Sequence, residues 1–260
     1  MDGELHARAA ASFGAQASAY AEHRPDYPAA AIHWALEPLG RQHSLVVLDL
    51  GAGTGKLTAG LLGAGAEPIA VEPDAEMRSE LIARYPDVTT LAGAAESIPL
   101  PDNSVDAVLS GQAFHWFDQE RAFPEIARVL RDGGVFAALW NTDDSTVDWL
   151  IGLQAVSRPR VAVPPPKPGD QLPKHPLFLD FERAEFPHAQ RRTAESLTTT
   201  IGTHSHTLVI TEPERTELLG RILDYLRSRP ETADGEFDVP LVTDVIRAVR
   251  RTETPVPQRK

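Results

Sequence analysis

The 260-residue sequence is 42% hydrophobic and 24% charged, a composition typical of a folded globular protein that excludes intrinsic disorder for most of the chain. Its 25 Lys and Arg against 37 Asp and Glu give a formal charge of -12, which disfavours a nucleic acid and favours a small-molecule partner. The absence of cysteine excludes disulfides, zinc–thiolate sites and cysteine nucleophiles. The sequence shows neither a signal peptide nor an apolar run of membrane-spanning length, so we expect a cytoplasmic protein that does not bind a membrane.

The first half of the chain alternates apolar runs with amphipathic segments. The pattern predicts strands at residues 45–50, 68–72, 88–92, 105–110 and 135–140, and helices at residues 56–62, 75–85 and 119–130. A turn at residues 132–134 is expected to end the third helix before the fifth strand. Such alternation is typical of an α/β fold with a doubly wound parallel sheet and right-handed crossovers.

The pattern is weaker after residue 141. Seven prolines between residues 159 and 176 exclude a regular element and indicate a surface loop or a substrate lid. A late strand at residues 181–192, a helix at residues 212–229 and a strand at residues 236–249 would complete the sheet. We expect one domain over residues 1–260, made of an N-terminal cap (1–43), a cofactor-binding core (44–141), an insertion with a late strand (142–195), a C-terminal helix and sheet edge (196–251) and a tail (252–260).

A glycine-rich turn follows the first strand, at the edge where open α/β sheets bind ligands. Gly51, Gly53 and Gly55 alternate directly after Asp49, and the helix start that follows can bind a carboxylate through its N–H groups. Glu72 ends the next strand, roughly twenty residues after the first glycine, where an acid binds ribose hydroxyls. Together these residues predict a site for a nucleoside-bearing cofactor.

Two related phosphate-binding motifs do not fit this turn. A phosphate-binding loop requires four residues between its first glycine and Gly-Lys, and Leu57 stands where that loop needs Ser or Thr. The dinucleotide pattern G-x-G-x-x-G requires glycine where this chain has Lys56. A NAD-type oxidoreductase therefore remains only as the alternative hypothesis.

Several ordered motifs resemble those of class I S-adenosylmethionine-dependent methyltransferases. They are LDLGAGTG at residues 48–55, VEP at 71–73, GAAESIP at 93–99 and LRDGG at 130–134. RPDYP at residues 24–28 and QAFHWF at 112–117 are similar to the small-molecule branch of methyltransferase type 11 proteins that includes trans-aconitate methyltransferase-like enzymes. The resemblance covers residues 13–141. It implies a Rossmann-like, mostly parallel seven-stranded sheet with an antiparallel edge strand, an N-terminal helical cap and an insertion after strand five.

The resemblance also implies a reaction and roles for individual residues. The protein would move a methyl group from S-adenosylmethionine to an O, N, S or C nucleophile of a small molecule and release S-adenosylhomocysteine. Asp49 and the turn would hold the methionine portion and Glu72 the ribose, whereas Met77 would pack on adenine. The full set of expected cofactor-binding residues is Asp49, Gly51, Ala52, Gly53, Thr54, Gly55, Glu72, Pro73, Met77, Ala95, Glu96, Gln112 and Ala113.

Two residues at the end of the fourth strand are candidates for the acceptor side. His115 would be a general base if the acceptor is a neutral hydroxyl or amine, and Trp116 would offer an aromatic face to the sulfonium. A structural role for His115, core packing by Met77 and a catalytically inactive cofactor-binding protein remain open alternatives. Tyr20, Arg24 and Tyr27 are candidate cap residues. His204 and His206 lack a carboxylate constellation, so no metal site is predicted.

Overall fold

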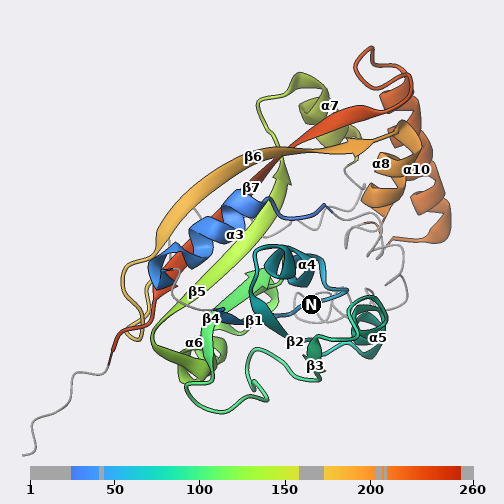
Figure 1. The fold of residues 1–260 in the computed structure, drawn as a ribbon. Helices are drawn as coiled ribbons and strands as arrows, with labels where there is room; N and C mark the ends of the chain where they lie inside the picture. Colours follow the sequence, from blue (N-terminus) through green and yellow to red (C-terminus); the bar gives the residue numbers. More distant parts are fainter. Residues whose placement is uncertain (1–24, 41–43, 158–172, 203–206, 208–209, 253–260) are drawn as a thin grey trace, which may run out of the picture.

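The computed structural model describes residues 25–40, 44–157, 173–202, 207 and 210–252. Within these residues seven strands form one sheet in the order β3-β2-β1-β4-β5-β7-β6 (Figure 1). The strands are β1 (Val46–Leu50), β2 (Glu67–Val71), β3 (Thr89–Leu91), β4 (Val105–Gly111), β5 (Leu130–Asp143), β6 (Glu182–Arg192) and β7 (Phe237–Val249). The first five pair in parallel, and β7 runs antiparallel to both β5 and β6.

This topology confirms the predicted Rossmann-like, mostly parallel seven-stranded sheet. The antiparallel strand β7 lies one position in from the edge, and β6 is the outermost strand. Because β7 is antiparallel to both β5 and β6, β6 runs parallel to β5 and to the rest of the sheet. Within the described residues β6 pairs with β7 alone.

Helices cover both faces of the sheet. On one face, α3 (Ala29–Leu36) and α4 (Lys56–Gly63) bury Ile32 and Leu61 in a cluster with Val47. On the other face, α6 (Gln119–Val129) buries Phe123 in a cluster that includes Leu48. Val47 and Leu48 belong to opposite clusters because successive side chains of a strand point to opposite faces. The remaining elements of this half are α5 (Ala75–Arg84) and the short 3-10 helices η2 (Glu37–Leu39) and η3 (Phe114–Trp116).

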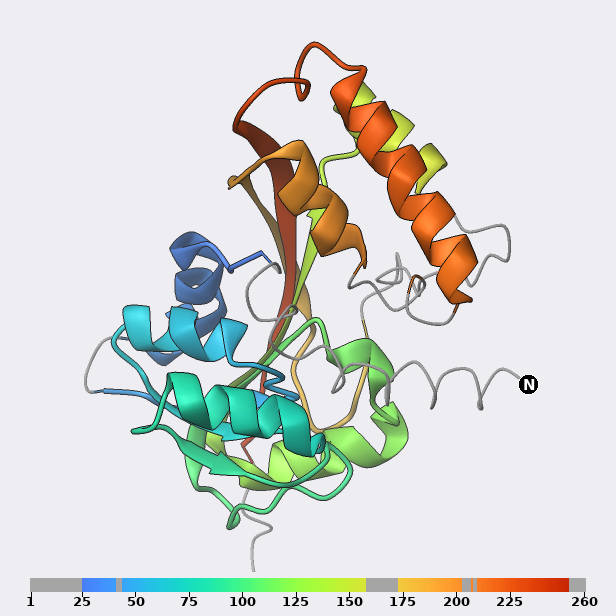
Figure 2. The ribbon, with the colours of Figure 1, turned by 90° about the vertical axis from the view of Figure 1, so that its right-hand side faces the viewer.

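A third apolar cluster lies at the far ends of β5 and β7. It is formed by α7 (Asp148–Val156), α8 (Ala194–Gly202) and α10 (Glu212–Arg227) together with the first residues of β7. Leu150, Ile222 and Leu226 are fully buried in it. These helices gather away from α4, α5 and α6, so the strands connect two separately packed regions (Figure 2).

Neither α7 nor α8 is predicted from the sequence. The helix α8 contains the run Thr198, Thr199 and Thr200, and β-branched residues favour strands. In the structure their hydroxyls donate to the carbonyl oxygens four residues earlier, at 2.8, 3.0 and 2.9 Å. These bonds satisfy the hydroxyls within the helix but do not favour it. The burial of Leu197 and Ile201 in the third cluster is what outweighs the strand propensity.

The expected turn at residues 132–134 is wrong as a boundary. The strand β5 begins at Leu130, which pairs with Val105, and the register then shifts before Ala107 pairs with Val135. Gly133 has φ of 74° inside this irregular stretch. The glycines therefore bend the start of a long strand and do not separate it from α6.

Some expectations fall on residues outside the described ranges. These are the cap residues Tyr20 and Arg24, most of the proline-rich segment, His204, His206 and residues 253–260. Within the described ranges, no helix is long and apolar enough to cross a membrane, and no three His, Cys, Asp or Glu side chains gather as metal ligands.

Candidate functional site

The glycine turn between β1 and α4 adopts a conformation that requires its glycines. Gly51, Gly53 and Gly55 have φ of 73°, 56° and 88°. A Cβ on Gly51 would lie 2.6 Å from the Cβ of Ala113, and one on Gly55 would lie 2.9 Å from the ring of Tyr85. Positive φ is costly for other residues, and the two close approaches leave no space for a side chain. The backbone of the turn is thus packed tightly against the end of β4 and the end of α5.

Asp49 is a buried carboxylate with an unused acceptor atom. Its side chain is fully buried, and Oδ2 accepts a hydrogen bond of 2.6 Å from the Thr58 hydroxyl. Its Oδ1 is buried with no partner in the described part of the chain, and the same holds for Oγ1 of Thr54. Burial raises the pKa of Asp49 from 3.8 to about 7. An ionised Asp49 at neutral pH therefore calls for a cationic hydrogen-bond donor at Oδ1.

Glu72 follows β2 and supports the glycine turn directly. Its Oε2 accepts from the Gly53 N–H and its Oε1 from the Asp74 N–H, both at 2.9 Å. Arg78 Nη1 donates to the carbonyl oxygens of Glu72 and Pro73 at 2.9 and 2.7 Å, which fixes the backbone at this point. Burial raises the pKa of Glu72. Two bonds leave about half of the acceptor capacity of the carboxylate for a ligand.

A pocket opens at the carboxyl ends of β1 and β4. The residues that line it come from the N-terminal segment, the glycine turn, the start of α4 and the ends of β4 and β5: Pro25, Tyr27, Asp49, Gly51, Ala52, Gly53, Thr54, Lys56, Leu57, Gly111, Gln112 and Asn141. Six expected site residues meet here: Asp49, Gly51, Ala52, Gly53, Thr54 and Gln112. Gln112 has φ of 57°, an unusual conformation for a residue with a side chain, and its Nε2 donates to the Asn141 carbonyl at 2.8 Å.

The sequence does not predict Asn141, Lys56 or Gly111 as pocket residues. Lys56 directly follows the glycine turn, and this position in the sequence could have marked it as a pocket residue. Its Nζ lies 2.9 Å from Oδ1 of Asp26, whose side chain is exposed. Asn141 follows the predicted fifth strand, and the carboxyl end of a parallel strand is where a ligand-binding residue is expected.

The residues expected near adenine lie outside this pocket. Met77 is buried in the first turn of α5, where its N–H donates to Asp74 Oδ1 at 2.9 Å. Ala95 is buried, and Glu96 Oε1 accepts from the Asp118 N–H at 2.8 Å. Pro73 and Ala113 do not line the pocket either. The structure therefore brings the turn and the end of β4 together at the pocket. Met77 on α5, and Ala95 and Glu96 after β3, lie outside its lining.

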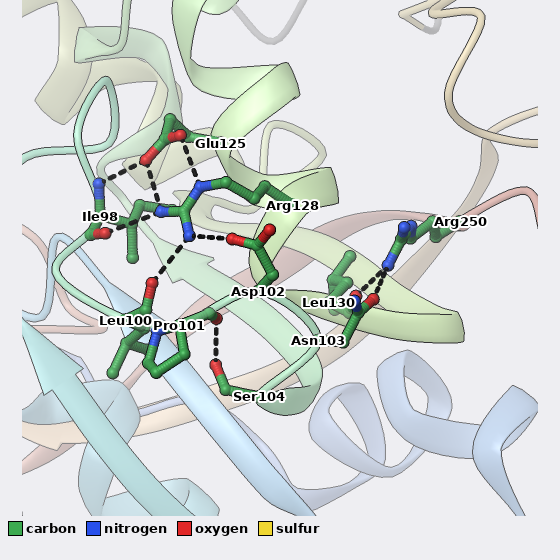
Figure 3. A network of polar contacts seen from close by, with 10 residues as sticks. All are labelled: Ile98, Leu100, Pro101, Asp102, Asn103, Ser104, Glu125, Arg128, Leu130 and Arg250. Carbon is green, nitrogen blue, oxygen red and sulfur yellow. Dashed lines mark hydrogen bonds and ion pairs between the residues drawn. The ribbon is translucent and has the colours of Figure 1, made fainter.

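A polar network fixes the chain that follows Ala95 and Glu96. Arg128 on α6 pairs with Glu125 and Asp102, and its guanidinium donates to the carbonyl oxygens of Ile98 and Leu100 at 2.9 and 2.8 Å (Figure 3). Glu125 Oε2 accepts from the Ile98 N–H at 2.8 Å. Hydrogen bonds from Arg128 lower the pKa of Glu125. This network ties residues 98–102 to α6.

His115 and Trp116 lie on η3 beyond the end of β4. Both are half-buried, their ring centroids are 5.0 Å apart, and neither lines the pocket. The Trp140 indole N–H donates to His115 Nδ1 at 3.3 Å. A neutral His115 in this arrangement carries its proton on Nε2, so Nε2 acts as a donor and not as a base.

The fold and this pocket define a class I methyltransferase architecture, and comparisons with known proteins agree. A family of methyltransferase domains matches residues 48–138. An uncharacterized methyltransferase of Mycobacterium tuberculosis is 39% identical over 91% of this chain and 95% of its own length. A methyltransferase-like protein of Schizosaccharomyces pombe is 33% identical over 86% of this chain and 90% of its own. The chain belongs to this methyltransferase family.

Two further comparisons concern structure and substrate. A structure presented as that of a type II methyltransferase from Anaeromyxobacter dehalogenans superposes with a TM-score of 0.61, at 30% identity over 87% of this chain and 97% of its own. A malonyl-[acyl-carrier protein] O-methyltransferase of Methylococcus capsulatus is 40% identical over 35% of this chain and 35% of its own length. Because the chain belongs to the methyltransferase family, the alternative hypothesis of a NAD-type oxidoreductase is not supported.

Proposed function

We propose that the protein binds S-adenosylmethionine in the pocket at the glycine turn and transfers its methyl group to a small molecule. The observation that carries the proposal is Oδ1 of Asp49, which is fully buried beside the turn and has no partner among the residues that the structure describes. The methionine portion of this cofactor carries an ammonium group, which is the cationic donor that such a carboxylate requires. The sulfonium supplies the methyl group when the cofactor is bound.

The expected roles of the other cofactor residues follow from this placement. The glycine turn and Thr54 would hold the methionine carboxylate and neighbouring polar atoms, and Glu72 would accept from the ribose hydroxyls with its remaining lone pairs. The adenine side would be formed by residues after β2, on α5 and after β3: Pro73, Met77, Ala95 and Glu96. Gln112 and Ala113 at the end of β4 would face the sulfonium. The same residues would hold the product S-adenosylhomocysteine.

The acceptor is proposed to be a small molecule of the kind used by the trans-aconitate methyltransferase-like branch. The formal charge of -12 disfavours a nucleic acid, and the partial similarity to a malonyl-[acyl-carrier protein] O-methyltransferase is consistent with a carboxylate acceptor. A carboxylate is already a nucleophile at neutral pH, so positioning of donor and acceptor can supply most of the acceleration, about 7–11 kcal/mol.

His115 and Trp116 are proposed to act on the acceptor side. A base role for His115 requires that Nδ1 exchange its Trp140 contact for the acceptor. Trp140→Phe would release Nδ1, so it should preserve or raise turnover if His115 is the base, and His115→Ala should then lower turnover far more than cofactor affinity. Equal losses of turnover and affinity in His115→Ala would reject the base role.

Calorimetric titration with S-adenosylmethionine and S-adenosylhomocysteine tests the cofactor, with NADH as the control ligand. Both sulfur compounds should bind and NADH should not. Glu72→Gln keeps the shape of the side chain but removes its charge, and we expect it to weaken binding by about tenfold. Failure of either sulfur compound to bind the wild-type protein would refute the proposal.

Methyl transfer to a panel of carboxylate, hydroxyl and amine acceptors then tests activity. Formation of S-adenosylhomocysteine with one acceptor class would identify the substrate chemistry. Binding of the cofactor without transfer to any class would favour the inactive cofactor-binding protein over the enzyme.

A further inference from the structure

Asn141 at the end of β5 connects the N-terminal segment to the pocket. Its Nδ2 donates to the carbonyl oxygens of Pro25 and Asp26 at 3.3 and 3.2 Å, and its Oδ1 accepts from the Thr243 hydroxyl at 2.6 Å. The orientation of the amide is fixed because the two carbonyls can only accept hydrogen bonds. Reversing the amide would place three oxygen atoms against one another.

Thr243 on β7 receives a second contact from β6. The Thr243 side chain is fully buried, and His188 Nε2 lies 2.9 Å from its Oγ1. The hydroxyl has one proton, which it donates to Asn141 Oδ1, so His188 Nε2–H must be the donor to Thr243. Each donor therefore meets an acceptor in the series of hydrogen bonds that runs from His188 through Thr243 and Asn141 to the N-terminal segment.

The same segment forms a wall of the cofactor pocket. Pro25, Tyr27 and Asn141 all line it. The Tyr27 hydroxyl packs so closely on the end of β4 that a Cβ on Gly111 would lie 2.6 Å from it. The backbone carbonyl of Asn141 also accepts from Gln112 at 2.8 Å, so Asn141 contacts both this wall and the end of β4, which line the pocket.

We propose that Asn141 is a positioning residue that holds residues 25–27 against the cofactor pocket, with its amide oriented by Thr243 and His188. We call Asn141, Thr243 and His188 together the Asn141 latch. The proposal rests on the proposed function for the identity of the ligand, whereas the placement of residues 25–27 is a property of the free protein. Through the latch, β6 and β7 control cofactor retention although Thr243 and His188 do not line the pocket.

Thr243→Val tests the latch without altering a pocket residue. Valine has the shape of threonine and removes only the hydroxyl, whereas Thr243→Ser keeps the hydroxyl and serves as the rescue variant. Thr232→Val is the matched control, because Thr232 is 1% exposed and its hydroxyl donates locally to the Leu226 carbonyl at 2.6 Å, away from the pocket. Amide hydrogen exchange over residues 25–32 is measured in the free protein, and the dissociation constant of S-adenosylmethionine by calorimetry.

Thr243→Val should exchange these amides about fivefold faster and bind the cofactor about fivefold more weakly, the loss expected for about one hydrogen bond. Thr243→Ser and Thr232→Val should both stay within about twofold of the wild type in exchange and affinity. Unchanged exchange in Thr243→Val, or an equal increase in Thr232→Val, would overturn the latch. Faster exchange in a protein whose wild type binds no S-adenosylmethionine would support the latch and refute the proposed cofactor.

Discussion

Substituting Asp49 with asparagine should stabilise the protein at alkaline pH while removing cofactor binding. The carboxylate is fully buried, and its Oδ1 has no partner among the described residues. Asparagine can still accept the Thr58 hydrogen bond, but it carries no charge that must be desolvated. The expected gain in stability comes from removing this charge, and the expected loss of function comes from removing the partner of the cofactor ammonium.

The magnitude follows from the pKa of Asp49, which burial raises from 3.8 to about 7. Below pH 3.8 the carboxyl is protonated in both the folded and the unfolded state and costs nothing. As the pH rises, the unfolded chain loses its proton first, so the wild-type free energy of unfolding falls until the folded state also ionises near pH 7. One pKa unit is worth about 1.4 kcal/mol, so the free energy of unfolding falls by about 4 kcal/mol in total between the two pKa values.

The assay is urea unfolding of the wild type and Asp49→Asn at pH 5 and pH 8. The free energy of unfolding of the variant, relative to the wild type, should rise by about 2.5 kcal/mol between the two values, or about 5–10 °C in Tm. The control Asp26→Asn removes an exposed carboxylate that pairs with Lys56 and should show no such rise. A difference between wild type and Asp49→Asn that does not change with pH would refute the reasoning.

Three further outcomes are expected. The affinity for S-adenosylmethionine should rise about tenfold from pH 6 to pH 8 as Asp49 ionises, measured by calorimetry, and a flat profile would contradict the ion pair. Gly51→Ala, whose Cβ would lie 2.6 Å from that of Ala113, should lose about 2–4 kcal/mol of stability. Gly53→Ala, whose Cβ would have no described atom within 4 Å, should lose only the backbone cost of about 1–2 kcal/mol. Equal losses in urea unfolding would contradict the packing argument. Arg128→Ala should lower the Tm by about 5–10 °C in calorimetry through loss of the network on residues 98–102, and an unchanged Tm would show that the network contributes nothing.

Much of the fold was predictable because local patterns agree with the tertiary structure. The alternation from β1 to β4 places each strand and helix within two residues of its observed bounds, whereas β5 begins five residues before its predicted start. The glycine turn marks the ligand-binding edge. Asp49 and Glu72 are also predicted from the sequence as site residues. Their buried environment and raised pKa values follow from their places at the ends of two adjacent strands.

The remaining features depend on contacts between distant residues. Asn141 reaches Pro25, which is 116 residues away in the sequence, and accepts from Thr243, which is 102 residues away. No local pattern marks such a pair. The bond from the Gly53 N–H to Glu72 is equally hidden, because the sequence suggests Glu72 as a ribose ligand or as an ordinary acid at a helix start and gives no sign of this contact. The helix α8 was missed because its threonine run follows strand propensity, whereas packing decides the outcome.

The most direct test of the central claim is a crystal structure of the protein with S-adenosylhomocysteine bound. The account predicts that the amino group of the ligand lies within hydrogen-bonding distance of Asp49 Oδ1 and that its ribose hydroxyls contact Glu72. A ligand bound elsewhere, or one whose amino group leaves Asp49 Oδ1 unpaired, would contradict the assignment of this pocket.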